Sequence, residues 1–194
     1  MPAKSGSRQT ALDIWLHLRI ELADVIPLVW REVIVPARIT LPKLHSVILK
    51  TMGWEGGHLH EFQFRDEAYG IPDPDWDYGV QSQNRVTLRN ALAGSRSFIY
   101  TYDFGDDWQH RVQVLSEFLP VPGTDRIRCL AGQNACPPED VGGAFGYADY
   151  LEAIANPEHE EHETWINWRG SGFDPDCFDI QTANLRLAEF KSGK

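Results

Sequence analysis

Two histidines spaced two residues apart carry the clearest metal-ligating pattern in this chain. They occur in His58-Leu59-His60-Glu61, and in an extended strand residues two apart point to the same face, as two ligands of one ion must. The alternative is a pair of histidines on the polar face of a half-exposed strand. His110 lies in a second predicted strand, and Asp106 lies in the turn before that strand. If the two strands are neighbours, all four side chains converge on one point.

Two cysteines extend this candidate metal site. Six residues separate Cys129 from Cys136, a spacing that differs from the CxxC of zinc knuckles. Three interpretations of the two cysteines are possible: they are small buried residues, they bind a metal together with a histidine, or they form a redox pair. The metal reading predicts a divalent transition metal such as zinc as cofactor. It would make the protein a metal-dependent hydrolase, with Glu61 or Asp107 as the base that activates water.

Other catalytic patterns have weak support. His159 and His162 flank two glutamates, but zincin helices need histidines four apart around a glutamate, so a solvated acidic helix face fits better. The chain has no glycine-rich phosphate loop and no GxSxG nucleophile elbow. The sequence therefore argues against a nucleophilic hydrolase.

A binding site is the competing interpretation of the same region. The stretch from Tyr102 to His110 places three aspartates, one histidine and three aromatic residues between two strand-like runs. Such loops on a rigid scaffold often carry function, although large aromatic residues more often contribute to the core. We therefore predict a groove lined by the loops around it. The predicted binding residues are Trp54, Tyr102, Trp108, Glu139, Asp140 and Tyr147.

Hydrophobic periodicity predicts the elements that would position these residues. Alternating apolar residues predict five strands at 14–22, 30–35, 58–65, 97–102 and 108–118. Helical spacing predicts an early helix at 40–53, capped by Thr40 and ended by Gly53, and a short one at 86–93. Later helices are predicted at 147–155, 159–168 and 180–190, and the proline- and glycine-rich segments 69–83 and 119–143 are predicted as loops. The predicted class is α+β, with a mostly antiparallel sheet of about five strands and a C-terminal helical cluster.

Composition narrows the choice of partners. The formal net charge is -10, and the segment 129–168 holds eight acidic residues and no lysine or arginine, which argues against direct nucleic-acid binding there. No apolar run is long enough to span a membrane and no secretory leader is present, so we expect a cytoplasmic protein. Three cysteines fit reduced thiols or a metal site better than disulfides. We expect a disordered tail at 1–9 and one domain at 10–194, with an unknown protein or small-molecule ligand as partner.

Several phrases occur together in a fixed order along the chain. They are Ile26-Pro27 with Trp30-Arg31, Leu44-His45, Met52-Gly53-Trp54, His58-Leu59-His60-Glu61-Phe62, Tyr69-Gly70, the stretch from Tyr102 to His110, Cys136-Pro137-Pro138-Glu139-Asp140-Val141-Gly142-Gly143 with Gly146-Tyr147, and Phe173-Asp174-Pro175. Together they resemble the plasmid Orf-three-like family of the Agrobacterium Ri-plasmid type, also labelled a transposon-passenger TnpR-like family. The resemblance spans residues 12 to 187 and implies an α+β domain of bacterial, archaeal or mobile-element origin.

Three functions follow as hypotheses. A non-catalytic binding or interaction module leads, because the mixed ligand set matches no standard metal spacing. A metal-dependent hydrolase is the first alternative. The second is a resolvase-like accessory factor in DNA transactions, which rests on the family label alone. Serine recombinases need a nucleophilic serine near arginines and a basic DNA-binding segment, whereas this acidic chain offers only Ser5 and Ser7 in its tail.

Overall fold

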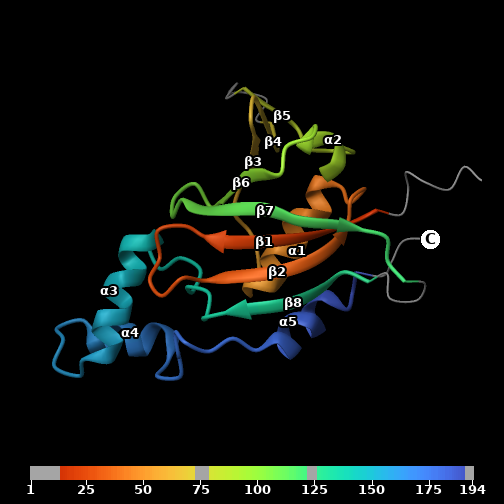
Figure 1. Ribbon diagram of the computed structural model, residues 1–194. Helices are drawn as coiled ribbons and strands as arrows, with labels where there is room; N and C mark the ends of the chain where they lie inside the picture. Colours follow the sequence, from red (N-terminus) through yellow and green to blue (C-terminus); the bar gives the residue numbers. More distant parts are fainter. Residues whose placement is uncertain (1–13, 73–78, 122–125, 191–194) are drawn as a thin grey trace, which may run out of the picture.

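In the part of the chain that the structure describes, one mixed sheet of eight strands organises the fold (Figure 1). The computed structural model describes residues 14–72, 79–121 and 126–190. Within these ranges the strand order is β5-β4-β3-β6-β7-β1-β2-β8, and every pairing is antiparallel except that of β4 with β5. The strands are β1 Trp15–Leu22, β2 Trp30–Pro36, β3 His60–Phe64, β4 Glu67–Gly70, β5 Val80–Ser82, β6 Ser97–Tyr102, β7 Trp108–Phe118 and β8 Arg128–Gln133. The helices are α1 Leu41–Met52, α2 Leu88–Leu92, α3 Gly143–Ala155, α4 His162–Arg169 and α5 Ile180–Leu187.

The core lies on one face of this sheet. Along β1, Leu16, Leu18, Ile20 and Leu22 are buried, while the residues between them are partly exposed on the opposite face. This is the alternation that predicted the strand, and β1 pairs with β2 on one side and β7 on the other. The α+β class is confirmed, and all five predicted strands are present.

The predicted number of strands is wrong, because β5 and β8 lie in segments predicted to be loops and β4 overlaps the start of the predicted 69–83 loop. β4 has four residues and β5 has three, which is too short for an alternating pattern to stand out. β8 lies within the proline- and glycine-rich segment 119–143. The predicted disordered tail at 1–9 falls outside the described residues, as do residues 73–78 of the predicted 69–83 loop.

The helices follow the predicted positions with shifted ends. α1 begins after Thr40, has proline in its first turn, and ends at Gly53, whose φ of 104° suits glycine. It buries Leu44, Val47 and Ile48 and packs against α5, which in turn packs against β8. α3 begins at Gly143, four residues before the predicted start, and α4 begins at His162 rather than 159. Across the described residues, no helix combines the length and apolar character needed to cross a membrane.

A buried arginine joins β2 to the helices and to β8. Arg31 is 1% exposed, and its guanidinium donates to four backbone carbonyls, those of Trp30, Thr51, Gln133 and Asn134, at 2.7–3.0 Å. The guanidinium also lies 3.9 Å from the centre of the Phe178 ring. Desolvation lowers the pKa of Arg31, and the four carbonyls offset part of the cost of burying its charge. Arg31 therefore ties the C-terminal end of α1 to the end of β8.

The outer edge of β8 is covered by a side chain from α5. The Asn184 amide accepts from the Cys129 N–H and donates to the Cys129 C=O, each at 3.0 Å. It thereby occupies both main-chain groups of Cys129 as a neighbouring strand would.

Candidate functional site

Three loops bring His58, Asp103 and Asp140 together. His58 precedes β3, Asp103 opens the turn between β6 and β7, and Asp140 precedes α3. The His58 ring lies between the two carboxylates, with Nδ1 3.3 Å from Asp103 Oδ2 and Nε2 3.3 Å from Asp140 Oδ1. One potential ligand atom from each of these residues lies within 4.8 Å of the other two. In the part of the chain that the structure describes, no other group of three or more His, Cys, Asp or Glu side chains meets this distance. We call these residues the His-Asp-Asp group.

The three side chains differ in how firmly they are held. The Asp103 side chain is 13% exposed and the His58 side chain 35%, whereas the Asp140 side chain is 68% exposed. The Asp103 N–H donates to the Leu59 carbonyl at 2.9 Å, which fixes Asp103 beside the residue that follows His58. Asp140 can therefore reorient around two more rigid neighbours. Imidazole and carboxylate donors suit zinc, manganese and iron, and three of them leave coordination positions open to solvent.

A hydrogen-bonded glutamate holds the Asp140 loop in place. The Glu139 carboxylate accepts from the Tyr102 hydroxyl at 2.7 Å, from the Glu55 N–H at 2.9 Å and from the Gly56 N–H at 3.2 Å. Burial and then the hydrogen bond to Glu139 raise the pKa of Tyr102, so its hydroxyl is a protonated donor at neutral pH. Beside it, Trp54 Nε1 donates to the Pro137 carbonyl at 2.9 Å. Glu139 therefore positions Asp140, and its carboxylate oxygens are already engaged.

Glycine at the start of α3 lets the β6–β7 turn approach this loop. The Gly142 N–H donates to Asp106 Oδ2 at 3.2 Å, which brings the turn against the helix. Gly143 has a φ of 69°, and a Cβ at this position would lie 2.5 Å from the Asp106 carbonyl oxygen. Only glycine fits that contact without a backbone shift. The glycine pair after Asp140 thus sets the distance between the two aspartate-bearing loops.

The predicted metal-ligand set is not assembled. His60 is buried, with its ring stacked on His45 at 3.6 Å between centroids and its Nε2 3.0 Å from Gln83 Oε1. His110 is fully buried, and its Nδ1 lies 3.0 Å from the Trp108 carbonyl. His58 precedes β3, so the same-face argument for His58 and His60 fails because it assumed that both lie in a strand.

The other members of that set also have structural partners. Asp106 accepts from Gly142, as described above, and Cys129 Sγ donates to the Ala131 carbonyl at 3.3 Å. Burial raises the pKa of the Cys136 thiol to about 12, which keeps it protonated and a poor ligand or nucleophile. Of the six predicted metal ligands, only His58 belongs to the His-Asp-Asp group.

The aromatic residues of the predicted groove pack as a buried cluster. Trp54, Tyr102, Trp108 and Tyr147 are all buried. The Trp54 ring lies 5.2 Å from that of Tyr102 and 5.8 Å from that of Trp108, measured between centroids. These rings support the loops from below. Trp54 and Glu139 also line a hollow of about 330 Å³ beside Pro137 and Pro138. Of the predicted binding residues, Asp140 alone is both exposed and part of the candidate site.

Comparison with known proteins gives a family and a fold. Residues 15–182 match the family model described as plasmid pRiA4b ORF-3-like protein. The chain is 43% identical over 172 residues to the uncharacterized protein y4hQ of Sinorhizobium fredii (strain NBRC 101917 / NGR234), covering 88% of this chain and 86% of that protein. The crystal structure of the protein of unknown function MM3350 from Methanosarcina mazei Go1 superposes with a TM-score of 0.81 at 32% identity, covering 88% of this chain and 98% of that one.

Proposed function

The chain belongs to the family of plasmid pRiA4b ORF-3-like proteins, and on that premise we propose that it is a non-catalytic binding module whose ligand is a divalent transition-metal ion. One observation supports the proposal, the convergence of His58, Asp103 and Asp140 from three separate loops. Backbone conformation adds to it, since Asp103 and Asp140 have φ values of 56° and 61°. Non-glycine residues in this region cost energy and often occur at ligand sites.

The charge around the group favours a cation. The neighbouring turn adds Asp106 and Asp107, and the segment 129–168 contributes acidic residues without any lysine or arginine. A bound divalent ion would offset this charge locally. Entry of the ion would replace one of the two contacts between His58 and an aspartate, and the exposed Asp140 is the side chain that can turn to admit it.

A competing role for the same residues is a structural clamp. The His58 ring would bridge the two aspartates and hold the three loops together without any metal. The two roles differ in a measurable way, because a clamp contributes to stability in metal-free protein, whereas a metal site gives saturable binding of the ion.

Isothermal titration of metal-free protein with zinc and with manganese tests the proposal. We expect saturable binding of one ion per chain, weakened at least about tenfold in His58→Gln and in Asp140→Asn. His159→Gln is the matched control, because it removes a histidine from an acidic segment outside the group and should leave binding unchanged. Binding that is absent, or equally tight in His58→Gln, contradicts the proposal. A loss of thermal stability in metal-free His58→Gln, without any metal binding by the wild type, would assign the clamp role.

A metal-dependent hydrolase is the second candidate, favoured by one feature of the group. Three protein ligands with an exposed Asp140 resemble catalytic metal sites, which keep positions open for water. The metal-loaded wild type would then hydrolyse an activated phosphodiester such as bis(p-nitrophenyl) phosphate, and Asp140→Asn would not. Equal background rates in the two proteins would leave metal binding as the function. A role in DNA transactions stays a prediction from the family label.

A further inference from the structure

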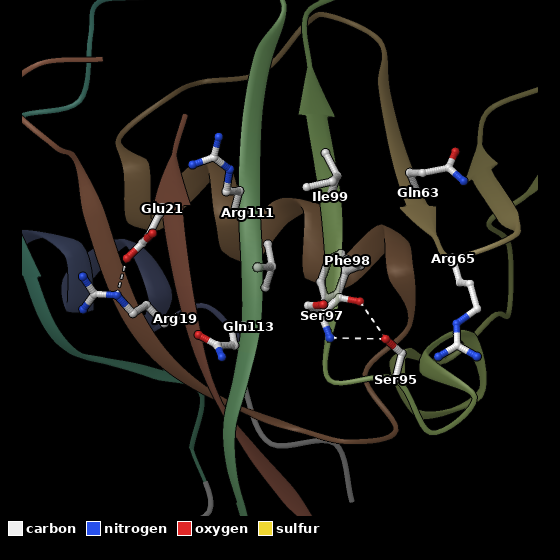
Figure 2. Close-up of a pocket in the computed structure, with 11 residues that line it drawn as sticks. Arg19, Glu21, Gln63, Arg65, Ser95, Ser97, Phe98, Ile99, Arg111 and Gln113 are labelled. Atoms are coloured by element: carbon white, nitrogen blue, oxygen red, sulfur yellow. Dashed lines mark hydrogen bonds and ion pairs between the residues drawn. The ribbon is translucent and has the colours of Figure 1, made fainter. Parts of the chain in front are cut away.

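A second candidate site lies on the sheet face that points away from α1. A hollow of about 620 Å³ spans β1, β3, β6 and β7, and Figure 2 shows the side chains around it. This volume is within the range of small-molecule sites, about 300–1,000 Å³. We call it the arginine hollow, because Arg19, Arg65 and Arg111 line it.

Strand register explains why these side chains gather. Arg111 on β7 pairs with Glu21 on β1 and with Ile99 on β6, and Ile99 pairs in turn with Gln63 on β3. Directly paired residues point to the same face of a sheet. The next row on that face contains Arg19 and Gln113 as another pair. The hollow is therefore built on four strands and on the turn after β3, in which Arg65 lies.

Only one of the three arginines has an acidic partner. Arg19 Nε lies 2.6 Å from Glu21 Oε1, and its Nη1 lies 3.2 Å from Glu32 Oε1. Glu21 is also the cross-strand neighbour of Arg111, but its contact is with Arg19. Within the described ranges, neither Arg65 nor Arg111 has an ion pair or a side-chain hydrogen bond. Two uncommitted guanidiniums thus line one hollow of a chain whose net charge is -10.

The rest of the lining suits an oxyanion with a compact body. Gln63, Gln113 and Ser97 supply uncharged donors, and Ile99 supplies an apolar surface between the strands. In Figure 2, Arg65 lies on one side of the hollow and Arg19 with Glu21 on the other, and Arg111 projects from β7 between them. Guanidinium groups bind carboxylate and phosphate oxygens through paired hydrogen bonds.

We propose that the arginine hollow binds a small, multiply charged oxyanion, held by Arg65 and Arg111 on the open face of the sheet. The ligand could be a carboxylate or a phosphate, because both present negatively charged oxygens that accept hydrogen bonds from guanidinium groups. This site is separate from the His-Asp-Asp group in the elements that form it and in the sign of its charge, so neither proposal depends on the other.

Titration of metal-free protein with citrate and, separately, with pyrophosphate tests this inference, with sodium chloride holding the ionic strength constant. We expect saturable binding of at least one of the two anions by calorimetry. The Arg65→Gln/Arg111→Gln variant should bind at least about tenfold more weakly, because each lost guanidinium removes charge-assisted hydrogen bonds. Binding of citrate alone assigns the carboxylate class, and binding of pyrophosphate alone assigns the phosphate class.

Two control variants make the result specific. Arg89→Gln removes an exposed arginine from α2, outside the hollow, and should leave binding unchanged. His58→Gln should also leave it unchanged, which separates the hollow from the His-Asp-Asp group. Arg65 and Arg111 are exposed, so the double variant should fold normally, with an unchanged melting temperature in the absence of anion. Binding of neither anion, or equal affinity in the double variant, overturns the inference.

Discussion

Lowering the pH from about 7.5 to about 5 should destabilise the folded protein, because the partly buried His45 and the fully buried His110 are held in their neutral forms. Burial and then the adjacent His60 lower the pKa of His45 to about 3. Burial lowers the pKa of His110 to about 4, although the Tyr100 and Trp108 carbonyls act in the opposite direction. The ordinary value, expected in the unfolded chain, is about 6.5. Below that pH the unfolded state binds protons that the folded state does not, so the free energy of unfolding falls as the pH falls.

The size of the effect follows from these values. At about pH 5 each histidine removes at most about 2 kcal/mol of stability relative to pH 7.5, and the two together remove about 4 kcal/mol. With a urea dependence of about 2 kcal/mol per molar, the unfolding midpoint should drop by about 2 M. Tryptophan fluorescence in urea at both pH values measures this difference directly.

Substitution assigns the effect to the two histidines. His45→Gln and His110→Gln should each reduce the difference between the two pH values by about 2 kcal/mol at most, and the double variant should retain only the part due to His60, whose pKa burial also lowers. Ile20→Val, a buried substitution without a titrating group, should lower the midpoint equally at both pH values. A double variant that retains the full difference would refute the reasoning, since other groups would then be responsible for the acid lability.

Three substitutions test the contacts that hold the site. Arg31→Lys should cost about 3 kcal/mol or more of unfolding free energy, because an ammonium cannot reach four separate carbonyls. Gly143→Ala should lower the free energy of unfolding by about 1–3 kcal/mol through backbone strain, and it should also weaken metal binding. Gly172→Ala is the control, because there is open space around Gly172, and urea unfolding should show almost no change. Tyr102→Phe should cost about 1–3 kcal/mol by removing the hydrogen bond to Glu139. Tyr150→Phe is its matched control, since that hydroxyl has no partner among the described residues, and a melting curve should detect no loss.

Long alternating or helical patterns were enough to predict much of the fold. β1 and β7 are long enough for their period of two to be clear, and α1 has a proline in its first turn and a terminating glycine, although the Thr40 side chain makes no capping hydrogen bond. β5 has three residues, and β8 is held by hydrogen bonds to β2 and to Asn184, which are distant in the sequence. Tertiary contacts, rather than local propensity, define these short strands.

The candidate site shows a similar division. His110 alternates with Val112 and Val114, and His60 with Phe62 and Phe64, so parity alone places both histidines on the core side of their strands. That signal was present in the sequence and argues against open metal ligands. The partnership of His58 with Asp103 and Asp140 carries no comparable signal, because these loops meet through tertiary contacts: the pairing of β3 with β6, the hydrogen bonds of Glu139 and the contact of Gly142 with the β6–β7 turn.

The amide of Asn184 also has a consequence for self-association. An exposed outer strand is a template for pairing with other chains, and such pairing leads to aggregation. Asn184 removes this possibility at Cys129 by occupying both of its main-chain groups. Because α5 follows every strand that the structure describes, a chain emerging from the ribosome completes this sheet before residues 180–187 can cover that edge. The chain without α5 is therefore the form most open to intermolecular β-pairing, and this exposure ends when α5 covers the edge of β8.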